Sequence, residues 1–342
     1  MDWPGEKALI KLGDLVSEGT GGAFAPWQTR RKARAEAEAK RAELLMLAQT
    51  EQDIEDIKSG KKQYTNDHQL ITVSQEEVDE NQETTPQLKG DRLEPYLDLE
   101  ALDRQAHVRK QAQMIQEEIN LTKTVLFAEQ ELESGDYEVN DEPVDPDWFT
   151  RWRDSAEKVT NEELQKLWAK ALAGEVTKPG SCSLRTLEFL KNLTQPEALQ
   201  IAKLAPYVIE DFIYRQPTLE ENGLDFMALL EMEDLGIITG MSGGGLTNNF
   251  TSIVSDSFIQ NFSYGGKVLL ITSSDPKRVV RLDGYKVTRL GQELFKLGVF
   301  PYDYKYIEAI GKYLKQQKFS VSIADITGFS PGKIHYTNEK EL

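Results

Sequence analysis

The sequence lacks most of the side chains on which metal and redox chemistry depend. Its 342 residues include one cysteine, Cys182, and three histidines. A single cysteine excludes an intramolecular disulfide framework and a cysteine-based zinc site. The histidines, at positions 68, 107 and 335, have no second ligand at metal-binding spacing. We therefore expect no metal and no cofactor, and we expect Cys182 to be a small packed residue or a loop thiol.

Long apolar runs and catalytic motifs are also missing. No stretch approaches the ~20 apolar residues of a membrane-spanning helix, and the start, Met1-Asp2-Trp3, is unlike a signal peptide. The glycines at 243–245 lack the lysine and hydroxyl residue of a phosphate-binding loop. We find no serine–histidine–aspartate set and no dinucleotide fingerprint. The sequence therefore predicts a non-enzymatic protein of the cytoplasm, with peripheral contact at the inner membrane as an alternative.

Positive charge is scarce. The chain has 40 lysines and arginines against 57 aspartates and glutamates, a formal net charge of -17. A surface this acidic repels phosphate groups, so DNA binding would need a segregated basic patch. The chain is more polar than an average globular protein, because its hydrophobic share is 39% and its charged share is 28%. This composition predicts exposed helices or a disordered segment.

The best-defined part of the chain is residues 160–209, within a predicted helical core at 145–210. Thr160 and Glu163 have the spacing of a capping box, and Thr194 with Glu197 repeats it. Between them, Pro179-Gly180 ends one helix, and Ser181 or Ser183 caps the next. The apolar positions of the first helix centre on Trp168, which we predict to be the structural hub. Asp145 or Asp147 is expected to cap the helix before it.

The N-terminal region, residues 1–62, is predicted to form a short amphipathic helix at 5–17 and a long alanine-rich helix from about residue 27. A basic cluster opens the long helix: Arg30, Arg31, Lys32 and Arg34. The short helix and the turn after it carry apolar residues that we predict to contact a membrane or a partner: Trp3, Leu9, Leu12, Leu15, Val16, Phe24 and Trp27. Alternatively, the short helix packs on the helical bundle or on a second subunit, or the basic cluster binds nucleic acid.

Two acidic segments, residues 63–96 and 134–147, flank a second long helix. Residues 63–96 are polar and weakly periodic, which predicts a linker. Residues 97–134 return to helical periodicity, with a stripe from Leu102 to Leu126. A helix of that length packs along another long helix, here the one at 27–60 or its copy in a second subunit. We therefore expect a homo-oligomer.

The C-terminal region, residues 220–342, changes periodicity. A helix ending at Gly236, strands, and a Thr288-capped helix resemble a winged-helix domain over residues 225–300. Lys277, Arg278 and Arg281 lie at the expected wing, whereas Glu231, Glu233 and Asp234 lie on the expected recognition side. Further elements are predicted at Lys267–Thr272 (strand), Tyr304–Gln316 (helix) and Phe319–Ile323 (strand). The predicted fold class is mainly α: long N-terminal helices, a helical core, and a small α+β winged-helix-like region.

The core segment 161–175, NEELQKLWAKALAGE, is followed by Pro179-Gly180 and by SLRTLEFLKNLTQPEA at 183–198. This succession is similar to a segment of the bacterial abortive-infection alpha family. The start of the long helix, Pro26-Trp27-Gln28-x-Arg30-Arg31-Lys32-Ala33, resembles an uncharacterised bacterial family with the same core. The resemblance spans roughly residues 5–45 and 145–300. It implies a role in anti-phage defence.

We therefore expect a non-enzymatic bacterial interaction protein that oligomerises through its long helices and contacts a membrane or a partner with its N-terminal helix. The alternative is a nucleic-acid-binding regulator that uses the winged-helix region.

Overall fold

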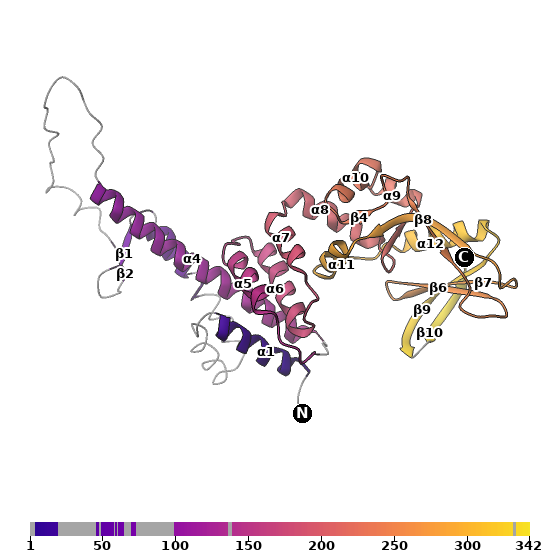
Figure 1. The fold of residues 1–342 in the computed structure, drawn as a ribbon, viewed down its shortest axis with the longest axis horizontal. Helices are drawn as coiled ribbons and strands as arrows, with labels where there is room; N and C mark the ends of the chain where they lie inside the picture. Colours follow the sequence, from indigo (N-terminus) through magenta and orange to yellow (C-terminus); the bar gives the residue numbers. More distant parts are fainter. Residues whose placement is uncertain are drawn as a thin grey trace, which may run out of the picture. The chain divides into compact units, whose positions relative to one another are not determined.

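A computed structural model describes residues 4–19, 46–47, 49–57, 59, 61–64, 70–72, 99–135, 139–330 and 333–342. The chain forms two compact units, Met1–Ser181 and Cys182–Leu342, and each is described by itself. Figure 1 labels the helices and strands. The division at Ser181 falls inside the helical core expected at 145–210. Trp3, Phe24, Trp27 and the basic cluster from Arg30 to Arg34 lie outside the described residues.

The first unit is built on one long helix, α4 (Leu99–Ser134). Three further helices contact it: α1 (Pro4–Gly19), α5 (Pro146–Ala156) and α6 (Glu162–Thr177). Residues 49–57 are also helical, and Ile54 and Ile57 pack on Ala112 and Ile119 of α4. Two short strands, β1 (Lys62–Tyr64) and β2 (Leu70–Thr72), pair antiparallel. The packing of α4 predicted along the helix at 27–60 is therefore present within one chain for the part that the structure describes, residues 49–57.

The apolar stripe predicted on α4 is buried over only part of its length. Ala112, Ile119 and Leu126 are buried, whereas Leu102 and Val108 are exposed. Side chains at positions 102–111 are all exposed in the described structure. Periodicity identified the helix, but it could not show where along the helix the covering elements end.

Local capping chemistry sets the helix ends of the first unit. Asp145, one of the two residues predicted to cap α5, accepts a hydrogen bond from the Asp147 backbone N–H at 2.8 Å and is the cap. The predicted Thr160 cap of α6 is wrong by one residue, because the Asn161 side chain accepts from the Leu164 N–H at 3.1 Å. Asn and Thr are both favourable N-cap residues, so the sequence alone could not decide whether Thr160 or Asn161 caps α6.

The second unit begins with two capped helices. Ser183 caps α7 (Leu184–Asn192), and Thr194 with Glu197 forms the predicted capping box of α8 (Gln195–Leu204). A 3-10 turn, η2 (Ala205–Tyr207), follows. The remaining helices are α9 (Pro217–Glu221), α10 (Phe226–Asp234), α11 (Arg289–Lys296) and α12 (Tyr304–Gln316). Thr288 caps α11, and α12 has the predicted bounds.

Two antiparallel sheets complete the second unit. In the first, β8 (Val280–Val287) pairs with β3 (Phe212–Tyr214) on one side and with β4 (Ile238–Thr239) and β5 (Leu246–Phe250) on the other. The second sheet has the order β10-β9-β7-β6. Its strands are β6 (Phe258–Tyr264), β7 (Lys267–Ser273), β9 (Ser320–Ser330) and β10 (Lys333–Glu341). Helix α12 contacts β7 and β9.

The predicted fold class, mainly α with a small winged-helix-like region, is wrong. The described part of the second unit contains eight strands in two sheets, so the chain is mixed α/β. Strands β3, β4 and β5 are short, and each forms by pairing with β8, which lies far along the chain. Their sequences therefore carry weak local signals. The strand predicted at Phe319–Ile323 is the start of a longer hairpin, β9–β10, that the sequence analysis did not extend.

Candidate functional site

Helix α1 carries four of the residues predicted to contact a membrane or a partner. Leu12 and Val16 are 1% and 2% exposed, and Leu9 and Leu15 are half-buried. The helix contacts α4, α5 and α6. The structure thus places this apolar stripe against the helices of the first unit.

A loop further along the chain also holds α1. The Lys11 Nζ donates to the backbone carbonyls of Asn140, at 2.9 Å, and Glu142, at 2.6 Å, and Lys7 pairs with Asp141. Burial lowers the pKa of Lys11, against the field of Asp141 and Glu175. These contacts bind the polar side of α1 to the loop before α5.

Trp168, the predicted hub, is 1% exposed. The Trp152 Nε1–H of α5 donates to the Trp168 carbonyl of α6 at 2.9 Å, which satisfies the indole inside the core. Phe149 stacks on Trp152 with ring centroids 5.6 Å apart. This aromatic cluster fixes α5 against α6, so it is a packing centre of the first unit.

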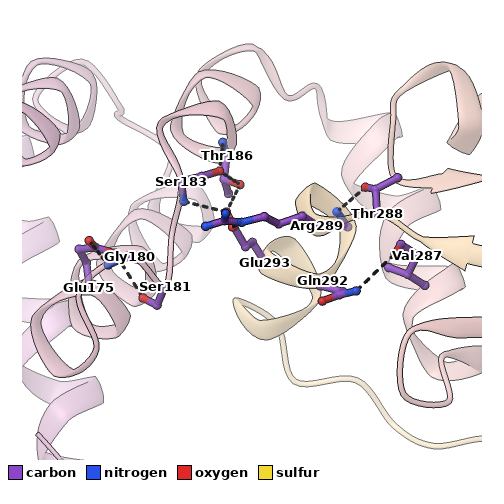
Figure 2. A network of polar contacts seen from close by, with 11 residues as sticks. Glu175, Gly180, Ser181, Ser183, Thr186, Val287, Thr288, Arg289, Gln292 and Glu293 are labelled. Atoms are coloured by element: carbon purple, nitrogen blue, oxygen red, sulfur yellow. Dashed lines mark hydrogen bonds and ion pairs between the residues drawn. The ribbon is translucent and has the colours of Figure 1, made fainter. Parts of the chain in front are cut away.

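Figure 2 shows a buried carboxylate in each unit. In the second unit, the Glu293 carboxylate accepts from the Ser183 N–H at 2.7 Å, from Thr186 Oγ1 at 2.6 Å and from Arg289 Nε at 2.7 Å. Burial alone would raise the pKa of Glu293, but these hydrogen bonds outweigh it and lower the pKa. Glu293 therefore joins α11 to the first turn of α7 as a carboxylate with its acceptors occupied.

The carboxylate of the first unit is Glu175. It accepts from the Gly180 N–H at 2.6 Å and from the Ser181 hydroxyl at 3.3 Å, as Figure 2 shows. Gly180 has a φ of 80°, a left-handed conformation that suits glycine. The side chain thereby closes the turn that follows α6, a structural task like that of Glu293.

A third acidic side chain organises the glycine-rich turn. The Glu233 carboxylate accepts from the N–H groups of Gly240, Met241 and Ser242 and from the Ser242 hydroxyl, at 2.6 to 3.0 Å. These bonds, led by the Ser242 hydroxyl, lower the pKa of Glu233. A shallow hollow lies beside this turn and includes Thr288. The N–H groups that could bind an external anion are thus already bonded to Glu233.

Tyrosines gather between the two sheets of the second unit. Tyr306 Oη donates to the Tyr214 carbonyl at 2.9 Å and accepts from the Tyr214 N–H at 2.6 Å. Tyr264 Oη donates to the Pro206 carbonyl and accepts from the Asp303 N–H. Burial raises the pKa of Tyr214 to about 12 and that of Tyr306 far above its ordinary value. These phenols therefore stay protonated and serve as structural donors.

In the described residues, no group of three or more histidines, cysteines, aspartates or glutamates could hold a metal ion. Cys182 is buried. Among the helices that the structure describes, none is both long and apolar enough to cross a bilayer.

The end of the β9–β10 hairpin is an exposed feature of the second unit. Strand β7 pairs with β9 only from Ser320 to Asp325, and the Ile326 N–H still donates to the Gly266 carbonyl. Beyond that point β9 and β10 pair only with each other in the described structure, and we call residues 327–330 and 333–337 the β9–β10 arm. The two strands run side by side in Figure 1.

The β9–β10 arm carries apolar side chains into solvent. Phe329 is 70% exposed and Tyr336 is 41% exposed, and Ile334 pairs with Phe329 across the hairpin. The Ser330 hydroxyl and His335 Nε2 lie 2.9 Å apart. The sequence analysis missed this arm. Its signal was alternation of apolar residues on either side of the Pro331-Gly332 dipeptide, which favours a hairpin.

Comparison with known proteins gives one family match. Residues 103–212 match a family model described as a protein of unknown function (DUF2806). The matched range begins in α4 and ends in β3. No curated protein and no solved structure matches the chain. The match covers about a third of the chain, and the β9–β10 arm lies outside it.

Proposed function

We propose that this protein is a non-enzymatic interaction protein that self-associates through the β9–β10 arm. The supporting observation is the exposure of Phe329 and Tyr336 on a hairpin with no third strand beside it in the described structure. A two-stranded hairpin is only marginally stable in water by itself. A partner strand on β10 would supply both backbone hydrogen bonds and cover for the aromatic side chains.

The sequence of β10 suits a second copy as the partner. Antiparallel pairing of residues 333–337 with the same residues of another chain, centred on His335, sets Ile334 opposite Tyr336 twice. Such aromatic–branched pairs stabilise a sheet by roughly 0.2–1 kcal/mol each. Lys333 faces Thr337 in this register, so no two lysines oppose each other. The pairing of β10 with β9 shifts register between His335 and Tyr336, where β9 contributes the extra residue, Thr327. It shifts again after Thr337, and Asn338 has a φ of 53°.

Self-association through the long helices, as expected from the sequence, has less support. The buried apolar residues of α4, which begin at Ala112, pack on Leu47, Ile54 and Ile57 and on other helices of the same chain. Leu102, Val108 and Met114 of α4 are exposed. The β9–β10 arm is therefore the better candidate for the self-association surface.

Light-scattering mass of the purified chain tests the proposal. We expect about twice the 38.7 kDa chain mass for the native protein, and the single-chain mass for the Phe329→Ser/Tyr336→Ser variant. The matched control is Leu199→Ser/Phe226→Ser, which removes two comparably exposed side chains of the second unit and should keep the dimer. A native protein of single-chain mass would refute self-association. A dimeric arm variant would refute the arm as its site.

The anti-phage role and the membrane contact of the N-terminal region stay predictions. Plating efficiency of phage on bacteria with and without the gene measures the first. Flotation with anionic liposomes, using the intact chain and a chain lacking residues 1–24, measures the second. Absence of flotation in both would refute membrane contact.

A further inference from the structure

Helix α12 presents a row of lysines to solvent. Its apolar side is buried through Tyr306, Ile307, Ile310 and Leu314. On the opposite side, Lys305 and Lys312 are both exposed. They lie seven residues apart, which is about 10 Å along a helix. The sequence analysis predicted this helix but did not single out the row.

More cations surround the C-terminal end of α12. Arg278 donates to the carbonyls of Gln317 and Lys318 and stacks on Phe319 at 4.0 Å. The Gln317 amide donates to the Arg281 carbonyl at 3.2 Å. These contacts hold the loop before β8 against the end of the helix. We define the α12 basic face by seven residues: Lys277, Arg278, Arg281, Lys305, Lys312, Lys315 and Lys318.

Local structural needs explain only part of this charge. Arg278 satisfies carbonyls at the helix end, and Lys315 pairs with Glu341 at 3.3 Å. The other five side chains of the α12 basic face have no ion pair or side-chain hydrogen bond to any described residue. Four acids lie on or beside the face: Asp275, Asp303, Glu308 and Glu341. The α12 basic face is therefore net positive, although the chain as a whole is strongly acidic.

The net charge is distributed unevenly between the two units. The second unit, Cys182–Leu342, has 17 basic and 19 acidic residues, so it carries -2 of the chain's -17. In a chain with a net charge of -17, nucleic-acid binding needs a segregated basic patch, and the α12 basic face is such a patch. The predicted wing residues Lys277, Arg278 and Arg281 form one end of it.

We propose that the α12 basic face binds the phosphate backbone of nucleic acid without reading its sequence. The exposed lysines of α12 can each approach a phosphate, since each strand of a duplex carries one phosphate per ~3.4 Å of helix axis. A lipid surface is a poorer fit, because interfacial helices insert an apolar side. The apolar side of α12 is buried, and it packs over β7 and β9. This inference goes beyond self-association and rests on different residues.

Fluorescence anisotropy with the full chain tests it. The probe is a labelled DNA duplex of arbitrary sequence, titrated at about 50 and 200 mM salt. We expect binding that weakens steeply with salt. The Lys277→Glu/Lys305→Glu/Lys312→Glu variant should bind at least about tenfold more weakly and lower the salt slope by about 3. A milder variant, Lys305→Gln/Lys312→Gln, should weaken binding in the same direction, and far-UV circular dichroism confirms that each variant is folded.

The matched control is Lys191→Glu/Lys203→Glu/Lys296→Glu. These exposed lysines lie on α7, α8 and α11, and the substitutions change the net charge of the second unit equally. The control should bind within about threefold of the native protein. Absence of salt-sensitive binding would overturn the proposal, and so would equal losses in both triple variants. Tighter binding to vesicles of anionic lipid than to the duplex, lost in the same variant, would overturn it in favour of a membrane.

Discussion

At the scale of single residues, buried carboxylates hold helix ends in both units. Glu293 is the clearest case, because it bonds the N–H and hydroxyl groups at the start of α7 from its place in α11. Replacing the Glu293 carboxylate with a neutral group removes one acceptor from the Ser183 N–H and Thr186 hydroxyl donors. Unsatisfied buried donors cost about 1–3 kcal/mol, and more where a charge is involved.

Glu293→Gln should therefore destabilise the second unit by about 1–3 kcal/mol at pH 7. The cost should shrink in acid. The folded-state pKa of Glu293 lies below its ordinary value of 4.5. Its contribution is thus complete above the unfolded-state pKa and is lost as pH falls through the folded-state pKa. Urea unfolding followed by circular dichroism at pH 7 and near pH 4 measures the difference.

Glu188→Gln, an exposed change on α7, serves as the control for Glu293→Gln and should be nearly neutral at both pH values. A Glu293→Gln deficit that stays constant or grows on acidification would contradict the assignment of an ionised, hydrogen-bonded carboxylate.

At the scale of elements, close backbone approach fixes how α11 packs. A Cβ on Gly291 would lie 2.4 Å from the Ile237 carbonyl oxygen, beside β4, and 2.9 Å from Val287 Cγ1. Gly291 is inside a helix, so intrinsic propensity alone predicts that alanine stabilises by about 1 kcal/mol. The two effects oppose each other, which makes the sign of the change informative.

Gly291→Ala should destabilise the protein by about 1–3 kcal/mol, because a backbone carbonyl cannot move aside as a side chain can. Thermal unfolding measures it. Gly243→Ala is the matched control, since its Cβ meets no atom within 4 Å and its φ is not positive. A more stable Gly291→Ala variant would show that α11 does not approach β4 this closely.

The elements also show which signals in the sequence are reliable. Thr194 and Thr288 were identified as caps, and Ser183 was one of two candidates, because a cap acts within four residues. Strands β3 and β4 span three and two residues, and their hydrogen-bond partner β8 lies about 70 and 50 residues away along the chain. The exposure of Phe329 likewise depends on where β7 stops pairing, which no local pattern specifies.

At the scale of the whole molecule, charge is divided unevenly. The first unit, Met1–Ser181, carries -15 of the net charge of -17. Like charges confined to one compact unit repel and destabilise it. Salt screens that repulsion, since the Debye length falls from about 30 Å at 0.01 M to about 10 Å at 0.1 M. The nearly neutral second unit has little repulsion to relieve.

Raising salt from about 0.01 to 0.1 M should therefore raise the urea midpoint of the first unit more than that of the second. The sequence supplies separate reporters. All five tryptophans precede Ser181, so their fluorescence follows the first unit, and the single cysteine, Cys182, is buried at the start of the second. Thiol labelling during urea titration reports its unfolding. Equal shifts in the two midpoints, or a larger shift in the second, would show that charge repulsion does not limit the stability of the first unit.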